Sequence, residues 1–310
     1  AMAAMAEKLG AKAAEGVAPE VVARSTALGQ AIAAHILAWS QSDGGAVVEN
    51  MGFPLEYTLT EGPAHWEPTS LIRQQQMPLL PNWGNNRTFA IADGAVCGLE
   101  APIPYSEDPA SDFYKEAKEV YDTTRALTDE QKIIARFWSD DPMLSPTPPG
   151  HWIAIIFQIA QDNDLPIEKQ VDALVRLGMA VSDGFIVNWR DKFKYDLLRP
   201  ITYIRRVIDP KWEPLLNTPP FPEYPSGHST QSGAAATVLT AFFGENFAFT
   251  DNTHEKDKLP NRSFKSFWDA AEEAGVSRLY GGIHFRAAID RGLDQGRCIG
   301  EKTVALRTRG

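Results

Sequence analysis

The longest helical pattern in the sequence runs from residue 166 to residue 198, and it constrains the fold more than any other stretch. Pro166 lies in its first turn, where no amide hydrogen is needed, and Pro200 follows its end, where the helix cannot continue. Strand signals are almost absent. Apolar residues recur at helical spacing in the stretches 20–40, 111–127, 128–141 and 151–163. These patterns predict an all-α protein whose helices pack as a bundle.

The domain organisation follows from the absence of any linker-like stretch. The length of 310 residues allows one domain or two. Residues 41–110 are rich in Gly, Pro, Asn and Trp, and their tryptophans need burial. We expect a single helical domain over residues 1–310, in which an N-terminal helix and a wrapping loop (1–110) precede a helical bundle (111–310).

Composition excludes several classes of function. A hydrophobic content of 44% and a charged content of 23% are typical of a globular protein. The net charge of −10 argues against nucleic-acid binding, which needs a broad basic surface. We find no run of about 18 apolar residues and expect no membrane span. The residues do not say whether Cys97 and Cys298, the two cysteines, are paired. We expect a secreted or periplasmic protein whose export signal has been removed.

A stiff, proline-rich stretch leads into Pro225-Ser226-Gly227-His228. Prolines fix the approach in an extended form, and from Ser229 the residues are small and tolerated in helices. Ser226 or Ser229 can cap a helix that begins there, and such a helix end attracts anions. By itself the stretch is equally well explained as a turn with an ordinary capping serine.

Two further stretches carry charged or imidazole groups. Lys192 and Arg199 lie seven residues apart near the end of the long helical pattern, a spacing that predicts both cations on one helical face. Arg278 and His284 flank a Gly281-Gly282 pair, which allows a tight turn. Alone, the first stretch is typical of a solvated surface and the second of a break between helices.

Taken together, the three stretches resemble the signature of one superfamily. It contains the type 2 phosphatidic acid phosphatases, the bacterial acid phosphatases and the vanadium-dependent haloperoxidases. The match runs from residue 192 to residue 284, and the N-terminal half has no comparably sharp motif. In chain order it consists of Lys192, six residues and Arg199-Pro200; Pro225-Ser226-Gly227-His228; and Ser277-Arg278, five residues and His284.

This combination suits a tetrahedral oxyanion, and the resemblance implies bound vanadate, or phosphate in the same site. The cations and two neutral donors would hold the oxygens. An axial imidazole, His284, would bind vanadium or attack phosphorus, and His228 would transfer a proton. The expected oxyanion ligands are Lys192, Arg199, Ser226, Gly227, Arg278 and His284. The expected catalytic residues are His228, His284 and Lys192, of which Lys192 polarises the bound peroxide.

Two aromatic residues favour peroxidase chemistry. Trp189 and Phe221 resemble positions of the fungal-type vanadium chloroperoxidases that line the halide side of the cofactor; ordinary core aromatics are the alternative. We therefore predict a vanadate-dependent haloperoxidase that oxidises halide with hydrogen peroxide to hypohalous acid. An organic acceptor and a homo-oligomer are compatible with this function.

Two other functions remain open. A soluble acid phosphatase would hydrolyse phosphomonoesters through a phospho-histidine at His284. A non-catalytic oxyanion-binding protein would not need His228, because binding alone requires no proton-transfer group.

Three further features of the sequence are weaker candidates for parts of the site. His151 is either a group that supports the site or a polar helix end. The polar segment 249–264, with His254, is a loop over the site, a calcium-like surface site or a plain solvated loop. Asp290 could orient a histidine through a hydrogen bond, or it is a surface acid.

Overall fold

The computed structural model describes residues 2–45, 52–70, 76–92, 96–140 and 146–307. The chain divides into two compact units, Ala1–Val47 and Val48–Gly310. The single domain over residues 1–310 stays a prediction. Part of the proline-rich loop before His151, at residues 141–145, lies outside the described residues.

The first unit contains the helices α1 (Met2–Ala13) and α2 (Pro19–Ser40). Pro19 occupies the first turn of α2, and no residue of α2 is buried. The sequence predicts no membrane span, yet α2 has the length and apolar composition to cross a membrane. A signal sequence near an N-terminus meets the same criteria, so α2 by itself does not establish a membrane span.

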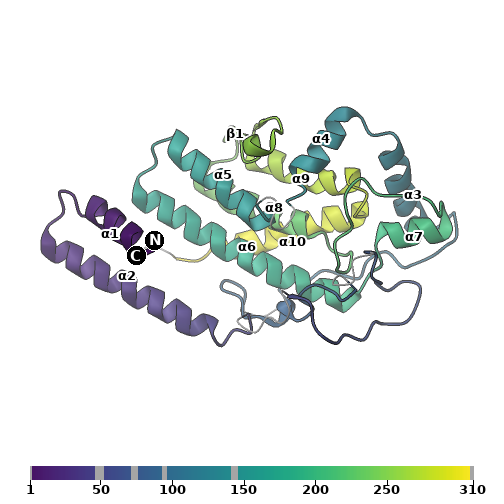
Figure 1. The fold of residues 1–310 in the computed structure, drawn as a ribbon, viewed down its shortest axis with the longest axis horizontal. Coiled ribbons are helices and arrows are strands. Elements are labelled where there is room, and N and C mark those ends of the chain that lie inside the picture. The colour runs from purple at the N-terminus through teal and green to yellow at the C-terminus, as the bar shows by residue number, and fades with distance from the viewer. Residues whose placement is uncertain (1, 46–51, 71–75, 93–95, 141–145, 308–310) are drawn as a thin grey trace. The chain divides into compact units, whose positions relative to one another are not determined.

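The second unit is a helical bundle with one short hairpin (Figure 1), which confirms the all-α prediction. Its elements are η3 (Trp83–Asn85), α3 (Asp112–Arg125), α4 (Asp129–Phe137), α5 (Pro148–Asp162), α6 (Ile167–Tyr195), α7 (Pro200–Val207), α8 (Gly227–Phe243), β1 (Phe249–Asp251), η4 (Glu255–Asp257), β2 (Arg262–Phe264), α9 (Phe267–Tyr280) and α10 (Arg286–Val304). The two strands pair antiparallel, with Asp251 opposite Arg262.

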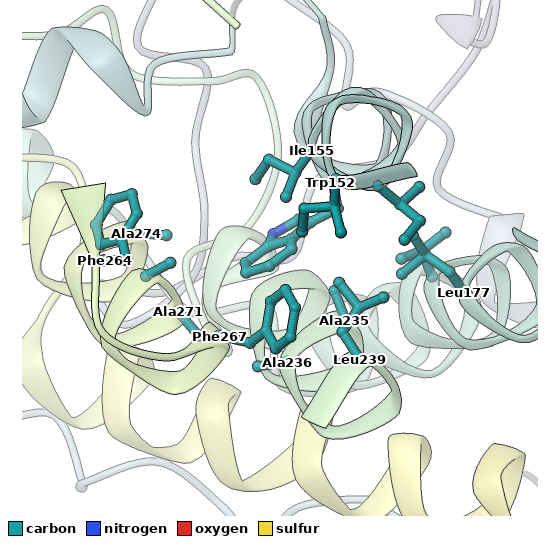
Figure 2. Close-up of a cluster of buried hydrophobic side chains, with 14 of the residues drawn as sticks. Trp152, Ile155, Leu177, Ala235, Ala236, Leu239, Phe264, Phe267, Ala271 and Ala274 are labelled. Atoms are coloured by element: carbon teal, nitrogen blue, oxygen red, sulfur yellow. The ribbon is translucent and has the colours of Figure 1, made fainter. Parts of the chain in front are cut away.

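Helix α8 lies at the centre of the bundle and packs against α6, α9 and α10. Every residue from Ser229 to Ala236 is buried, because the small side chains predicted from the sequence let neighbouring helices approach on several sides. Figure 2 shows part of the core, where Trp152 of α5, Leu239 of α8 and Phe267 of α9 meet. The helix that begins at the Ser-Gly-His stretch is therefore held rigidly.

The segment from residue 52 to residue 110 has little regular structure within its described parts, and it is tied to α6. The backbone amides of Phe89 and Ala90 both donate to the buried carboxylate of Asp183, each at 2.7 Å. Leu99 N donates to Asp191 at 2.9 Å. A disulfide joins Cys97 to Cys298 of α10. The predicted wrapping loop is thus ordered by hydrogen bonds to buried acids.

Candidate active site

The three stretches of the sequence signature meet at one end of α8. Lys192 lies in the last turn of α6, Arg199 precedes α7, and Arg278 lies in the last turn of α9. Each of these cations is at most 1% exposed. Ser226 caps α8 by accepting a hydrogen bond from Ser229 N at 3.3 Å, as predicted, and His284 lies between α9 and α10.

The prediction that Lys192 and Arg199 share one helical face is wrong. Helix α6 ends at Tyr195, because Asp196 adopts a left-handed conformation with φ 49°, and Pro200 begins a new helix. The two cations nevertheless converge on the Phe221 ring, at 5.3 Å for Lys192 Nζ and 4.9 Å for Arg199 Cζ. The turn between the helices, rather than helical periodicity, brings them together.

Lys192 holds the chain that leads into α8. Its ammonium group donates to the backbone carbonyls of Pro222, Glu223 and Pro225. These contacts use all three ammonium donors. Burial and the nearby Arg199 keep the pKa of Lys192 well below its usual range. Lys192 therefore fixes the Pro-Ser-Gly-His turn and adds to the positive potential of the site.

Arg199 offers a donor that has no protein partner among the described residues. Its Nε donates to Phe221 O and its Nη1 to Ile283 O, both at 2.8 Å, while Nη2 is buried without a hydrogen bond. Burial lowers the pKa of Arg199 to about 9, although Glu223 opposes this shift. A buried guanidinium donor left without a partner is costly, which points to a ligand that accepts from it.

His284 presents a lone pair to the same place. Its Nδ1 lies 2.7 Å from Glu223 Oε1, which also accepts from Phe285 N at 2.9 Å, so Nδ1 carries the proton. Nε2 lies 3.1 Å from Arg199 Nη1. Burial, Arg199 and Lys192 hold the pKa of His284 well below its usual range, and the neutral ring has its lone pair at Nε2. This nitrogen can bind a metal or attack phosphorus.

Glu223 is a site residue that the sequence reasoning missed. It is fully buried, and burial raises its pKa to about 7 against the opposing charges of Arg199 and Lys192. The sequence feature that could have identified Glu223 is an acidic residue inside the proline-rich stretch that leads to His228. Asp290, which the sequence offered as a candidate to orient a histidine, is exposed, and Glu223 takes that role for His284.

His228 is the imidazole of the site that reaches the surface, with 16% of its side chain exposed. Burial and the charge of Arg278 lower the pKa of His228 to about 4, so the ring is neutral at neutral pH. Its Nε2 lies 3.5 Å from Asp140 Oδ2 and 3.3 Å from Arg278 Nη1. Asp140, which follows α4, is a second residue that the sequence reasoning missed.

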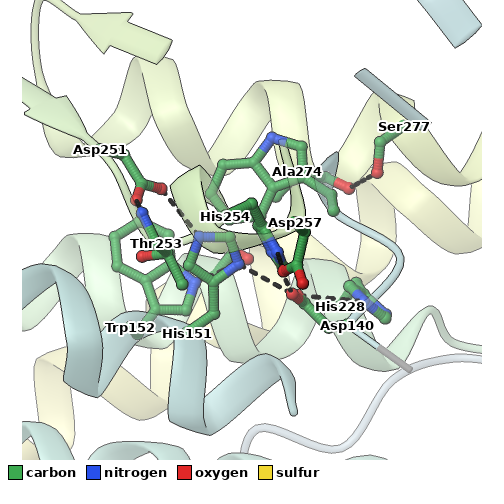
Figure 3. A network of polar contacts seen from close by, with 12 residues as sticks. Asp140, His151, Trp152, His228, Asp251, Thr253, His254, Asp257, Ala274 and Ser277 are labelled. Atoms are coloured by element: carbon green, nitrogen blue, oxygen red, sulfur yellow. Dashed lines mark hydrogen bonds and ion pairs between the residues drawn. The ribbon is translucent and has the colours of Figure 1, made fainter. Parts of the chain in front are cut away.

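A buried network continues behind Asp140 (Figure 3). His151 in the first turn of α5 is fully buried, and His254 of the hairpin is 2% exposed, so neither is a solvated polar end. His254 Nδ1 lies 2.9 Å from Asp257 Oδ2. Asp140, His151 and His254 offer ligand atoms that lie within 4.8 Å of one another. The interpretation of residues 249–264 as a plain solvated loop is wrong at His254.

Trp189 and Phe221 form an aromatic wall beside the cations. Their ring centroids are 4.8 Å apart, and Phe185 stacks on Trp189 at 3.9 Å. Trp189 is 3% exposed and its Nε1 donates to Leu79 O at 3.1 Å. Trp189 is thus a core aromatic and Phe221 a half-buried one, and both rings border the charged site.

The arrangement fits a tetrahedral oxyanion. The site contains three buried cations and one buried carboxylate, Glu223, one oxygen of which is already used by His284 and Phe285. The site therefore has an excess of positive charge, an unpartnered donor at Arg199 Nη2 and a lone pair at His284 Nε2. An anion such as vanadate or phosphate would satisfy each of these groups.

Comparisons with known proteins agree with this chemistry. The family model described as the VCPO second helical-bundle domain matches residues 172–309. The vanadium chloroperoxidase of Curvularia inaequalis is 25% identical over 211 residues, which cover 48% of this chain and 35% of that protein. This chain thus spans about a third of the length of that relative.

Solved structures extend the similarity to most of the chain. The first bacterial vanadium-dependent iodoperoxidase matches with a TM-score of 0.84 and 40% identity, over 98% of this chain and 73% of that one. A holo-type bacterial vanadium-dependent chloroperoxidase matches with a TM-score of 0.66 and 19% identity, over 80% of this chain and 63% of that one. The second match supports the fold alone.

Proposed function

The chain belongs to the vanadium-dependent haloperoxidase family, and we propose that it oxidises a halide with hydrogen peroxide to hypohalous acid by means of bound vanadate. The observation that carries this proposal is the pairing of a buried, unpartnered donor at Arg199 Nη2 with the neutral His284 Nε2. One group demands a negative oxygen and the other a Lewis acid, and vanadate supplies both.

Five of the six oxyanion ligands predicted from the sequence would contact the anion, whereas Lys192 would act through its charge alone, because backbone carbonyls use its three donors. His284 Nε2 would hold the vanadium, oriented by the hydrogen bond from Nδ1 to Glu223. Arg199, Arg278, the Ser226 hydroxyl and the Gly227 amide would donate to the oxygens, and the charge of Lys192 would stabilise them. Bound vanadate would supply a Lewis-acidic centre that activates peroxide for oxygen transfer to halide without a change in oxidation state.

His228 would be the proton-transfer group. Nε2 lies 3.5 Å from Asp140 Oδ2 and would carry the ring proton, which would leave the lone pair at Nδ1 to take a proton from hydrogen peroxide. The exposed part of the ring gives peroxide and water access to it. Because the pKa of His228 is about 4 without a bound anion, the base is available at neutral pH and is lost as the pH falls through that pKa.

The halide would reach the site along Trp189 and Phe221, whose rings border Lys192 and Arg199. Iodide is our proposed substrate, because the relative with 40% identity is an iodoperoxidase and because iodide is the most easily oxidised of the common halides. The small-molecule partners would be hydrogen peroxide, halide and an organic acceptor of the oxidised halogen. A homo-oligomer stays a prediction.

The proposal predicts that orthovanadate switches the protein on. We expect vanadate-dependent triiodide formation from iodide and peroxide, measured beside monochlorodimedone bromination and para-nitrophenyl phosphate hydrolysis. Phosphate should compete with vanadate, because both fit the same cationic site. A soluble acid phosphatase would instead hydrolyse the ester and be inhibited by vanadate. Tight vanadate binding with neither activity would indicate a non-catalytic oxyanion-binding protein.

We also propose a secreted or periplasmic location. The Cys97–Cys298 disulfide supports it, because such bonds persist in oxidising compartments and are rare in the cytosol. Peptide mass mapping of the protein from its natural host should show the two cysteine peptides joined and protected from alkylation until a reductant is added. Free thiols at both positions in freshly isolated protein would contradict this location.

A further inference from the structure

His151 has a carboxylate on each of its ring nitrogens. Nδ1 lies 2.8 Å from Asp140 Oδ1, and Nε2 lies 2.8 Å from Asp251 Oδ2 (Figure 3). His151 and Asp251 are fully buried, and Asp140 is 2% exposed. A neutral imidazole has one N–H, so one lone pair would face a carboxylate oxygen at hydrogen-bond distance. With both carboxyls ionised, only a doubly protonated ring satisfies this geometry.

Two further observations support a cation here. The Trp138 ring stacks on His151 with centroids 4.5 Å apart and an interplanar angle of 26°, an arrangement that stabilises an imidazolium by a cation–π contact. Burial works against the charged form, but Asp140 and Asp251 overcome it and raise the pKa of His151 to about 10.

Asp140 connects this cation to His228. Its Oδ1 accepts from His151, while its Oδ2 is buried without another hydrogen bond and lies 3.5 Å from His228 Nε2. A carboxylate fixed at one oxygen cannot rotate freely, so the hydrogen bond from His151 determines where Oδ2 points. His254 Nε2 lies 3.5 Å from Oδ1, the same distance as His228 Nε2 from Oδ2, and the His254 ring is held instead by the 2.9 Å contact of its Nδ1 with Asp257.

We propose that His151 is a permanently protonated positioning residue, held by Asp251, that fixes Asp140 so that its second oxygen orients His228 for proton transfer. The inference rests on the proposed role of His228 and adds the residue that fixes Asp140 beside it. The chain from β1 to the site is thus Asp251, His151, Asp140 and His228, in which the alternating charges of the first three residues fix Asp140 against the neutral ring of His228.

A metal ion is the competing occupant of this cluster, because Asp140, His151 and His254 could supply three ligands. The hydrogen-bond geometry disfavours it. A metal at His151 Nδ1 would have to replace the proton and part the 2.8 Å contact with Asp140. A proton on each ring nitrogen satisfies both carboxylates without moving them. The structure therefore assigns His151 Nδ1 to a proton and not to a metal ion.

Histidine ¹⁵N NMR tests the charge directly and does not depend on activity. The protein has six histidines, and His151→Gln identifies the signal of interest. We expect both nitrogens of His151 to show the protonated imidazolium shift from pH 5 to pH 9. Asp251→Asn keeps a hydrogen-bond acceptor but removes one negative charge. His151 should therefore lose its second ring proton below pH 9. A neutral tautomer at pH 7, or one zinc per chain by metal analysis, would overturn the proposal.

The pH dependence of peroxide kcat/KM tests the positioning role. The groups that face His228 are Arg278, Asp140, His151 and His284. His151→Gln removes a positive charge that lowers the pKa of His228, so this pKa rises and the acid limb should move up by about 1 pH unit. Loss of the fixed carboxylate should also lower kcat about 10-fold or more, as loss of an outer-shell partner does.

His254→Gln is the matched control, because this residue lies in the same cluster but is not one of the groups that shift the pKa of His228. It should leave the acid limb in place. His151→Asn provides a second variant in case His151→Gln does not fold. An unmoved acid limb with unchanged kcat in a folded variant of His151 would overturn the positioning role even if the imidazolium is present. A protein without halide oxidation would refute the proposed function, while the NMR result would stand.

Discussion

Replacing His284 with alanine is expected to abolish vanadate binding and to lower halide oxidation by about a thousandfold or more, as removal of a central catalytic group does. The reason is that His284 Nε2 is the neutral nitrogen that faces the buried cations, fixed by the 2.7 Å contact of Nδ1 with Glu223. Among the described residues, His284 is the imidazole whose Nε2 contacts Arg199, at 3.1 Å from Nη1. Isothermal titration with orthovanadate and initial rates with iodide and peroxide measure the two losses.

The control for this substitution is His35→Ala, which removes an exposed imidazole from α2. It should keep full vanadate affinity and activity. Circular dichroism and thermal unfolding show whether His284→Ala remains folded, and added imidazole should restore part of the vanadate binding by entering the vacated space. Full halide oxidation by a folded His284→Ala protein would refute the assignment of the site.

The helices were predictable because their ends are encoded locally. Thr128 and Gln131, which stand three residues apart in the sequence as a capping box requires, cap α4 with hydrogen bonds of 2.9 and 3.2 Å. Ser226 caps α8 as its position before the small residues indicates. The convergence of the signature residues was also predictable, through resemblance to a family and not through helical spacing, which failed for Lys192 and Arg199.

The partners of the two histidines could not be predicted, because each partner is set by tertiary packing. Glu223 reaches His284 across 61 positions of sequence, and Asp140 reaches His228 from the end of α4. His151 pairs with Asp251 across 100 positions. A sequence pattern shows that a buried acid must have a partner, but only the packing of α5, α8 and the hairpin selects which one.

The distance between the two histidines of the site depends on how closely α10 approaches α8. His228 begins α8 and His284 directly precedes α10, so the crossing of these helices sets their separation. Three glycines four residues apart, Gly292, Gly296 and Gly300, face α8 from one side of α10. A Cβ at Gly296 would lie 2.3 Å from Thr230 O and 2.6 Å from Ala234 N. Both contacts are with backbone, which cannot rotate aside.

Gly296→Ala is therefore expected to push the two helices apart, to lower the free energy of unfolding by roughly 3 kcal/mol or more, and to weaken vanadate binding. Gly178→Ala is the matched control: it lies within α6 with nothing within 4 Å of the added methyl group, and it should be neutral or stabilising by up to about 1 kcal/mol. Chemical denaturation and vanadate titration measure both effects. Equal stability of the two variants would show that α8 and α10 can separate without cost, and the close crossing would then not be what holds His228 and His284 in register.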